Sequence, residues 1–233
     1  YEPKVPEKIE RSTENIDDAV IDEAIKVLRN AKKPMVFVGG GAVISGADKE
    51  LKEFVEKVDA PVTDTLMGKG AFPGTDDRYV GMLGMHGTKT ANLSVSECDA
   101  LVVVCSRFSD RVTGNTANYA KNATIIQIDI DEAEINKNVS VDMSIIGDVK
   151  AVLERMNERM EQMYHKEWMD KVMARKDALP MTYSEEGLTC PYVMEKLDEL
   201  TDSDKTIICT EVGQHQMWAA QYYHYTHPRA LIT

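Results

Sequence analysis

The 233-residue chain contains few cysteines, and none of them stands in a metal-binding or redox pattern. The four cysteines form no C-x-x-C pair, and their spacing matches no zinc site. Few, scattered thiols suit a reducing cytoplasm, where we expect the protein to be located. Cys105 and Cys209 stand in apolar stretches, so we expect both thiols to be buried in the core.

Long apolar runs and an excess of positive charge are also missing. No segment approaches the length of a membrane span, and the first residues contain no signal-peptide core, so we expect no membrane partner. The formal net charge of −12 argues against a nucleic-acid partner, because a phosphate backbone is bound by a basic surface. Small phosphorylated ligands are compatible with this charge, since helix dipoles and a few cations can hold them.

The apolar pattern alternates between strand-like and helix-like segments, which predicts an α/β fold with a parallel sheet and right-handed crossovers. Strands are expected at 34–41, 60–65, 100–107, 123–130 and 142–148, and helices at 16–31, 47–58 and 87–98. Residues 148–178 are expected to form one long charged helical stretch. A second α/β unit then begins, with a helix near 190–200, a strand at 206–210 and a helix from about 214.

Ligands of open parallel sheets bind beyond the carboxyl ends of the strands, so the loops that follow the strands carry the candidate site. The first is a glycine triplet at 39–41, with Gly46 further on; it fits neither a P-loop nor the G-x-G-x-x-G pattern, and a tight turn without a ligand is the alternative. A second glycine-rich loop covers 66–74. The segment 84–92 leads into a helix whose N-terminus would hold an anion, with Thr88 and Lys89 as donors.

Charged residues follow the later strands. Two arginines in the segment SRFSDRVTG at 106–114 could neutralise a phosphate or carboxylate, unless this segment is a solvated turn. Asp129 and Asp131 could accept hydrogen bonds from ribose hydroxyls. Asp148 is equally well explained as the N-cap of the following helix. Together these loops favour an extended ligand such as a dinucleotide.

Several of these segments resemble the catalytic large subunit of acetolactate synthase, also called acetohydroxyacid synthase, a thiamine-diphosphate-dependent family. The resemblance lies in GGGAVISGA, LMGKGAFP, LGMHGTKTANLSVSECDALVVVCSRFSDRVTG, IIQIDIDEAEINKN and VGQHQMWAAQ, and it covers nearly the whole chain in order. It implies a central domain with a Rossmann-like six-stranded parallel sheet flanked by helices that binds FAD, followed by an incomplete α/β unit. We therefore expect a linker at 1–14, the FAD-binding domain at 15–155, a helical linker at 156–183 and the truncated start of the thiamine-diphosphate domain at 184–233.

The resemblance also implies which residues contact the cofactors. Those expected at FAD are Gly39, Gly40, Gly41, His86, Gly87, Thr88, Lys89, Arg107, Asp110, Arg111, Val112, Asp129, Ile130, Glu134, Asp148 and Val149. Those expected at thiamine diphosphate are Val212, Gly213, Gln214 and His215, at the start of a helix that would receive the diphosphate. Arg111 and Met217 are candidates for lining the substrate channel. The Mg²⁺ ligands of the family would lie outside this chain, and no complete catalytic set is expected within it.

The family's reaction condenses pyruvate with a second 2-keto acid, pyruvate or 2-ketobutyrate, with loss of CO₂. The products, acetolactate or acetohydroxybutyrate, lead to valine, leucine and isoleucine. The resemblance implies a homodimer or tetramer of the full-length protein, with or without a small regulatory subunit, and we expect this chain to be inactive alone.

Three alternatives stay open at this point. One is another thiamine-diphosphate enzyme, such as glyoxylate carboligase, pyruvate oxidase or indolepyruvate decarboxylase. A second is a non-catalytic module that binds NAD or ADP, of the deoxyhypusine-synthase-like or sirtuin-like type. A metal cluster of His215, His224 and His227 is a third, weakly supported interpretation.

Overall fold

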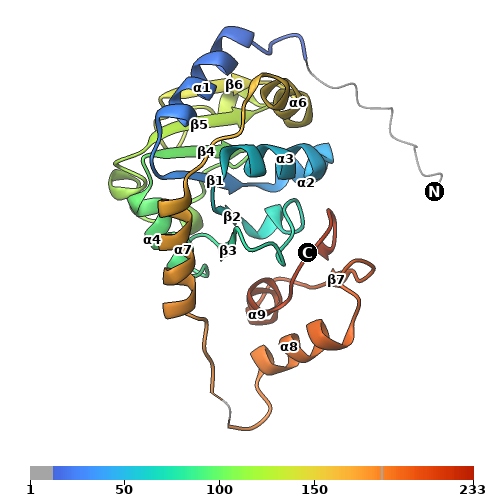
Figure 1. The fold of residues 1–233 in the computed structure, drawn as a ribbon. Coiled ribbons are helices and arrows are strands. Elements are labelled where there is room, and N and C mark those ends of the chain that lie inside the picture. Colours follow the sequence, from blue (N-terminus) through green and yellow to red (C-terminus); the bar gives the residue numbers. More distant parts are fainter. Residues whose placement is uncertain (1–12, 185) are drawn as a thin grey trace, which may run out of the picture.

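The fold is an α/β arrangement built on one parallel sheet, followed by a smaller unit (Figure 1). The computed structural model describes residues 13–184 and 186–233. Most of the expected linker at 1–14 therefore lies outside the described residues. Among the described residues, no helix combines the length and the apolar character that crossing a membrane requires.

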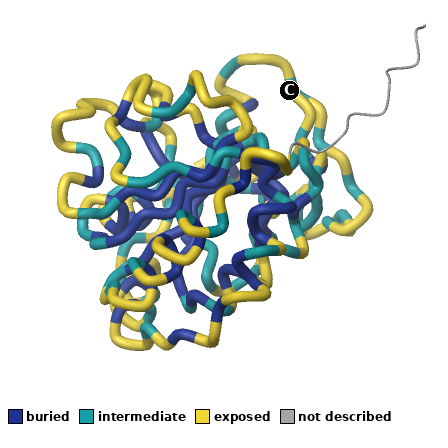
Figure 2. The backbone as a smooth tube through the Cα atoms, turned by 90° about the horizontal axis from the view of Figure 1, so that it is seen from above, coloured by how far each residue is buried: buried dark blue, intermediate teal, exposed yellow. Residues whose placement is uncertain are grey.

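Six strands pair in the order β3-β2-β1-β4-β5-β6, and every pairing is parallel. The prediction of a six-stranded parallel sheet is thus confirmed. The strands are β1 (Pro34–Val38), β2 (Val62–Asp64), β3 (Tyr79–Met82), β4 (Ala100–Val104), β5 (Thr124–Asp129) and β6 (Met143–Ile146). Strands β1 and β4 are buried along their whole length, because helices cover both faces of the sheet (Figure 2).

Helices cover the sheet on its two sides, and alternate residues of β1 point into two separate cores. Val36 and Val38 pack with helices α1, α3 and α6, whereas Met35 and Phe37 pack with α4 and α7. The helices of the described chain are α1 (Asp18–Asn30), α2 (Gly40–Ser45), α3 (Asp48–Val58), α4 (Lys89–Glu97), α5 (Asp110–Thr113), α6 (Val149–Arg159), α7 (Lys166–Ala178), α8 (Cys190–Leu200) and α9 (Gln214–Tyr222). Three short 3₁₀ helices lie at η1 (Leu66–Gly68), η2 (Thr116–Asn118) and η3 (Glu132–Glu134).

The prediction of one helical stretch over 148–178 is wrong. Helix α6 ends at Arg159, and α7 starts at Lys166. The intervening segment leaves the helical path because its residues pack against the first core. Met160 and Met163 are buried there, and Met163 N donates to Lys57 O at 2.8 Å.

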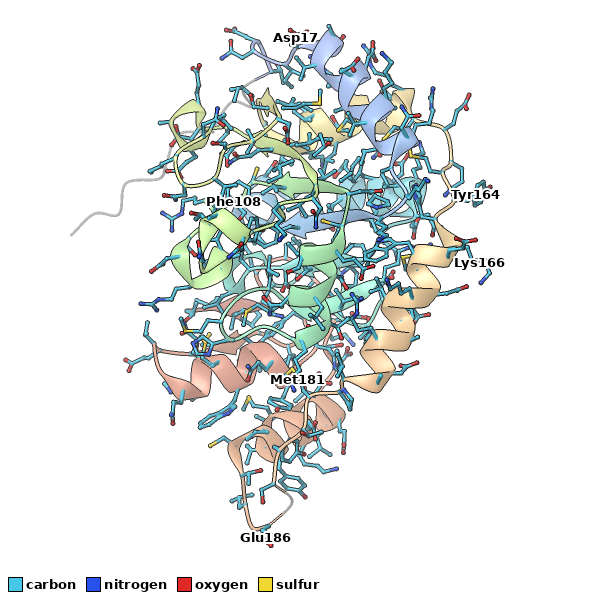
Figure 3. The ribbon with its side chains drawn as sticks, turned by 90° about the vertical axis from the view of Figure 1, so that its left-hand side faces the viewer. Asp17, Phe108, Tyr164, Lys166, Met181 and Glu186 are labelled. Carbon is cyan, nitrogen blue, oxygen red and sulfur yellow. The ribbon has the colours of Figure 1, made fainter. Side chains whose placement is uncertain are left out.

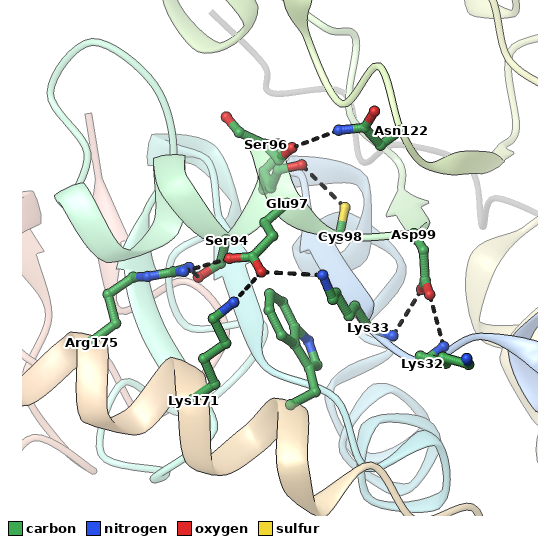
Figure 4. Close-up of polar contacts among 12 residues, drawn as sticks. Lys32, Lys33, Ser94, Ser96, Glu97, Cys98, Asp99, Asn122, Lys171 and Arg175 are labelled. Atoms are coloured by element: carbon green, nitrogen blue, oxygen red, sulfur yellow. Dashed lines mark hydrogen bonds and ion pairs between the residues drawn. The ribbon is translucent and has the colours of Figure 1, made fainter.

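Helix α7 is fastened to the sheet domain. Its buried Trp168 donates from Nε1 to the carbonyl oxygen of Pro34 at 2.9 Å. One turn further on, Lys171 and Arg175 bind the carboxylate of Glu97 on α4, which also pairs with Lys33 (Figure 4). The segment expected as a linker therefore contributes to the second core.

The C-terminal unit contains helices α8 and α9 and a two-stranded parallel sheet of β7 (Ile208–Cys209) and β8 (Leu231–Ile232). Its small core holds Tyr223, Tyr225 and Ala230. The prediction that Cys209 is buried is wrong, because this small sheet leaves the residue exposed. Cys105 is half-buried beside the first core.

Candidate cofactor site

The strand order reverses direction between β1 and β4, the two central strands of the sheet. From β1 the chain proceeds to β2 and β3 on one side, and from β4 to β5 and β6 on the other. The loops after β1 and β4 consequently diverge, which is where doubly wound sheets bind ligands. The expected FAD residues between 39 and 149 follow five of the six strands at this single edge.

The glycine triplet after β1 allows its backbone to lie against the end of β4. A Cβ atom on Gly39 would lie 2.0 Å from the carbonyl oxygen of Cys105, and one on Gly41 would lie 2.4 Å from the Cys105 Cβ. A Cβ on Gly40 would lie 2.9 Å from the Met67 Cβ. Close packing, rather than a tight turn, explains the three glycines, because Gly39 is the N-cap of helix α2 and Gly40 and Gly41 are its first residues.

The loop after β4 holds two non-glycine residues in the left-handed region, Cys105 at φ 51° and Phe108 at φ 50°. Phe108, labelled in Figure 3, is buried, and its ring packs edge-on against Tyr119 with the centroids 5.7 Å apart. Such conformations persist where the surroundings enforce them, and they concentrate at binding loops. Arg107 and Arg111, in and just after this loop, are both exposed.

The Cys105 thiol is not a reactive group. Burial, followed by the nearby carboxylates of Asp129 and Asp148, raises its pKa far above the ordinary thiol value. The thiol is therefore protonated at neutral pH, and its contribution is packing beneath the glycine triplet.

The loop after β3 is held by hydrogen bonds to neighbouring backbone groups, and only some of its side chains remain exposed. Met85 N donates to Arg111 O at 2.8 Å, which ties this loop to α5. Thr88 caps helix α4: its Oγ1 accepts from Ala91 N at 3.0 Å and donates to Val80 O at 2.6 Å. The donor expected at the Thr88 hydroxyl is thus used internally, whereas His86 and Lys89 are exposed.

Acidic groups follow β5 and β6. Asp129 is buried and accepts from Asp131 N at 3.1 Å, and burial raises its pKa. Glu134 pairs with Lys137 through Oε1, but its Oε2 is buried and has no hydrogen-bond partner among the described residues. Asp148 is the N-cap of α6, accepting from Lys150 N at 3.1 Å. The interpretation of Asp148 as the N-cap of the following helix is therefore confirmed.

Large apolar side chains are exposed at the same rim, a feature that the sequence reading did not single out apart from Ile130. The exposed fractions are 75% for Ile44, 59% for Met67, 70% for Met85 and 53% for Ile130. They follow four different strands, β1, β2, β3 and β5. An apolar rim that also carries arginines and an unpaired carboxylate oxygen fits a ligand with a flat apolar part, a diphosphate and a ribose.

The expected diphosphate residues lie at the start of α9. Val212 is 87% exposed, and Gln214 and His215 are exposed too. The N-cap residue Gly213 supplies no side-chain cap, so the first N–H groups of the helix are available to an anion. Met217 is half-buried one turn further along.

No histidine cluster forms in the C-terminal unit. His224 binds Asp198, with Nδ1 and Oδ2 2.6 Å apart, and His227 Nδ1 lies 3.0 Å from Pro228 O. No group of three or more His, Cys, Asp or Glu side chains in the described part of the chain could hold a metal ion. The metal interpretation of the histidines therefore has no support.

The glycine-rich loop at 66–74 contacts the C-terminal unit. Gly74 N donates to Tyr225 O at 2.8 Å, and a Cβ atom on Gly70 would lie 2.0 Å from His227 O. Beneath this contact, Asp64 and Lys69 form a buried ion pair at 3.3 Å that Tyr79 completes. The loop at 66–74, which we expected to contact a ligand, therefore also packs against the C-terminal unit.

Comparison with known proteins agrees with this architecture. Residues 21–156 match the family described as thiamine pyrophosphate enzyme, central domain. The chain is 40% identical to a probable acetolactate synthase large subunit of Methanococcus aeolicus, over 91% of this chain and 39% of the relative. It is 41% identical to a chloroplastic acetolactate synthase of Arabidopsis thaliana, over 99% and 35%. With an acetolactate synthase large subunit of Cyanidium caldarium the identity is 41%, over 87% and 36%.

These similarities confirm the resemblance to acetolactate synthases that the sequence motifs indicated. The chain spans 35% to 39% of the length of these relatives. The family match covers more than half of the chain and includes all six strands of the large sheet. The chain therefore belongs to the thiamine pyrophosphate enzyme family and contains its central domain.

Proposed function

We propose that this chain is part of an acetolactate synthase, which condenses two 2-keto acids with loss of CO₂. Three relatives that carry this name support the proposal with identities of 40% to 41%. The first substrate is pyruvate, and the second is pyruvate or 2-ketobutyrate. The activity is assigned to the whole protein, as a homodimer or tetramer with or without a regulatory subunit, because the chain spans only part of those relatives.

Within this chain, the carboxyl edge of the sheet is the FAD site of the domain at 15–155. The observation that carries this assignment is the rim itself: exposed apolar side chains on four loops stand beside Arg107, Arg111 and the unpaired Oε2 of Glu134. Apolar side chains suit the flavin ring, cations suit the diphosphate, and a carboxylate oxygen suits ribose hydroxyls. The glycines at 39–41 let the backbone after β1 pack closely against the end of β4.

The start of α9, in the domain at 184–233, contributes to the thiamine-diphosphate site. The free N–H groups after Gly213 orient the diphosphate, and Mg²⁺ would be held by residues outside this chain. When bound, thiamine diphosphate supplies the electron sink for decarboxylation of a 2-keto acid. Arg111 and Met217 face the substrate path, where an exposed guanidinium suits a carboxylate.

Flavin binding by the purified chain tests this proposal. The chain is incubated with FAD, passed through a gel-filtration column and examined for flavin absorbance. Glu134→Gln should weaken FAD binding about tenfold, since a hydrogen bond to a charged group contributes about 1.5–3 kcal/mol. Glu132→Gln, on the same 3₁₀ helix but exposed, is the matched control and should bind normally.

Two results would contradict the flavin assignment: a wild-type chain that retains no flavin, or equal binding by both glutamine variants. The activity is tested separately by acetolactate formation from pyruvate in the whole protein. A whole protein that binds FAD and thiamine diphosphate but forms no acetolactate would retain the cofactor assignment and refute the reaction.

A further inference from the structure

Helix α9 joins the two proposed cofactor regions. Its first turn follows Gly213, where the diphosphate is proposed to bind. Near its other end, Gln221 donates from Nε2 to the carbonyl oxygen of His86 at 2.7 Å. His86 lies on the exposed loop after β3, among the proposed FAD residues. At a rise of 1.5 Å per residue, roughly 10 Å of helix separates Gln214 from Gln221.

The helix is firmly seated, so it can transmit a change at one end to the other. Ala219 and Ala220 are buried, and Tyr225 OH donates to Ala219 O at 3.0 Å. The carbonyl oxygen of the same tyrosine accepts from Gly74 N at 2.8 Å, on the loop after β2. Helix α9 consequently rests on the sheet domain through two loops, and Gln221 makes the contact nearest to the proposed flavin.

The loop that Gln221 binds is held by one backbone hydrogen bond on each side of His86. Met85 N donates to Arg111 O at 2.8 Å, and Gly87 N donates to Gly84 O at 2.9 Å. Because its flanks are held, a ligand that orders this loop also fixes the position of the His86 carbonyl. The hydrogen bond to Gln221 then restricts the end of α9.

We propose that Gln221 is a positioning residue that couples FAD binding at the loop 84–88 to the order of helix α9 and thereby to the diphosphate site at its start. This inference rests on the proposed function and names the side chain through which the two cofactors influence each other. The coupling is reciprocal, because a site that stabilises α9 must also favour FAD.

Hydrogen exchange of the chain, with and without FAD, tests the coupling. FAD should slow exchange at the loop 84–88 and also at the amides of residues 217–222, the latter about fivefold, the effect of roughly one hydrogen bond. Gln221→Met keeps the length of the side chain but cannot donate, so FAD should slow only the loop. Gln221→Lys restores a donor and should restore the response of α9.

Gln162→Met is the matched control. Like the half-buried Gln221, the exposed Gln162 donates to a backbone carbonyl, Glu56 O at 2.8 Å, but it lies between α6 and α7 and far along the chain from both loops. Its α9 response to FAD should equal that of the wild type. If FAD protects the loop and residues 217–222 equally in Gln221→Met and wild type, the inference is overturned and the flavin site stands. If wild-type chain binds no FAD, the flavin site and the inference both fall.

Discussion

Replacing Glu97 with glutamine tests how firmly α7 is held to the sheet domain. The Glu97 carboxylate accepts from Arg175 at 2.5 Å and from Lys33 at 3.1 Å, and it also pairs with Lys171 (Figure 4). These contacts lower the pKa of Glu97 from 4.5 to about 2. The hydrogen bond from Lys171 is the largest cause, and those from Arg175 and Lys33 contribute less. Glutamine keeps the shape of the side chain and removes this charge.

The magnitude follows from the pKa and from the exposure of the partners. At about 1.36 kcal/mol per pKa unit, the full shift corresponds to about 3.4 kcal/mol. Solvent screens the lysines, whose side chains are 40% and 52% exposed for Lys33 and Lys171. We therefore expect Glu97→Gln to lower the free energy of unfolding by about 1–2 kcal/mol at pH 7.

The sign of the pH dependence is fixed by the direction of the shift. A carboxyl group with a lowered folded-state pKa stabilises the fold above its unfolded pKa of 4.5 and loses this contribution as the pH falls towards 2. The difference between wild type and Glu97→Gln should therefore be full at pH 7 and vanish near pH 2. Urea unfolding followed by circular dichroism measures it, and Glu167→Gln on the exposed side of α7 is the control. Equal stabilities at pH 7, or a difference that persists at pH 2, would refute the reasoning.

Three further changes have defined outcomes. Asp148→Ala removes the N-cap of α6 and should cost about 1 kcal/mol in thermal unfolding, without the larger loss expected of a core residue. Lys69→Met leaves the carboxylate of Asp64 buried and unpaired, so it should cost about 3 kcal/mol in urea unfolding, and adding Asp64→Asn should recover part of that loss. Gly70→Ala places a Cβ atom against His227 O at a backbone φ of 80°, so limited proteolysis should cleave between α7 and α8 faster than in wild type; an unchanged rate would contradict the docking role of this loop.

The central strands were readable from the sequence because they are buried on both faces. Strands β1 and β4 appear as continuous apolar runs, and β5 contains three isoleucines in six residues. Strand β3 was missed as a strand: it is four residues long, lies at the edge of the sheet, contains Gly81 and is only alternately buried. An edge strand of this kind is specified by its neighbour β2 more than by its own composition.

The break between α6 and α7 has a similar cause. Locally, residues 160–165 are compatible with helix, but Met163 N binds Lys57 O more than a hundred positions away in the chain. His165 completes the turn, with ring nitrogens 2.6 Å from Val58 O and 3.1 Å from Ala31 O. Contacts with the C-terminal ends of α1 and α3 thus determine the break between α6 and α7. The local sequence of residues 160–165 contains no pattern that predicts these contacts.

The rule that ligands bind at the carboxyl ends of strands located the candidate site, because the strands themselves were located. It predicts that the loops after β1, β2, β4, β5 and β6 lie at one edge, and the structure adds the loop after β3 to them. The exposed apolar residues Met67 and Met85 were not singled out, since an apolar residue in a loop is equally compatible with burial beneath a neighbouring segment. Only the packing shows that these two side chains face solvent.

Glycine illustrates what sequence can and cannot specify at such an edge. A glycine in a loop predicts that backbone or a ligand lies close to it, but the sequence does not indicate which neighbour this is. At Gly39 the neighbour is the end of the adjacent strand, and at Gly70 it is the chain near His227, over 150 positions later. Two glycine-containing loops thus have different roles: one packs against the end of β4 at the proposed flavin site, and the other packs against the unit whose helix α9 begins at the proposed diphosphate site. Because both tasks serve the same edge of the sheet, the geometry of each cofactor region depends on the packing of the other.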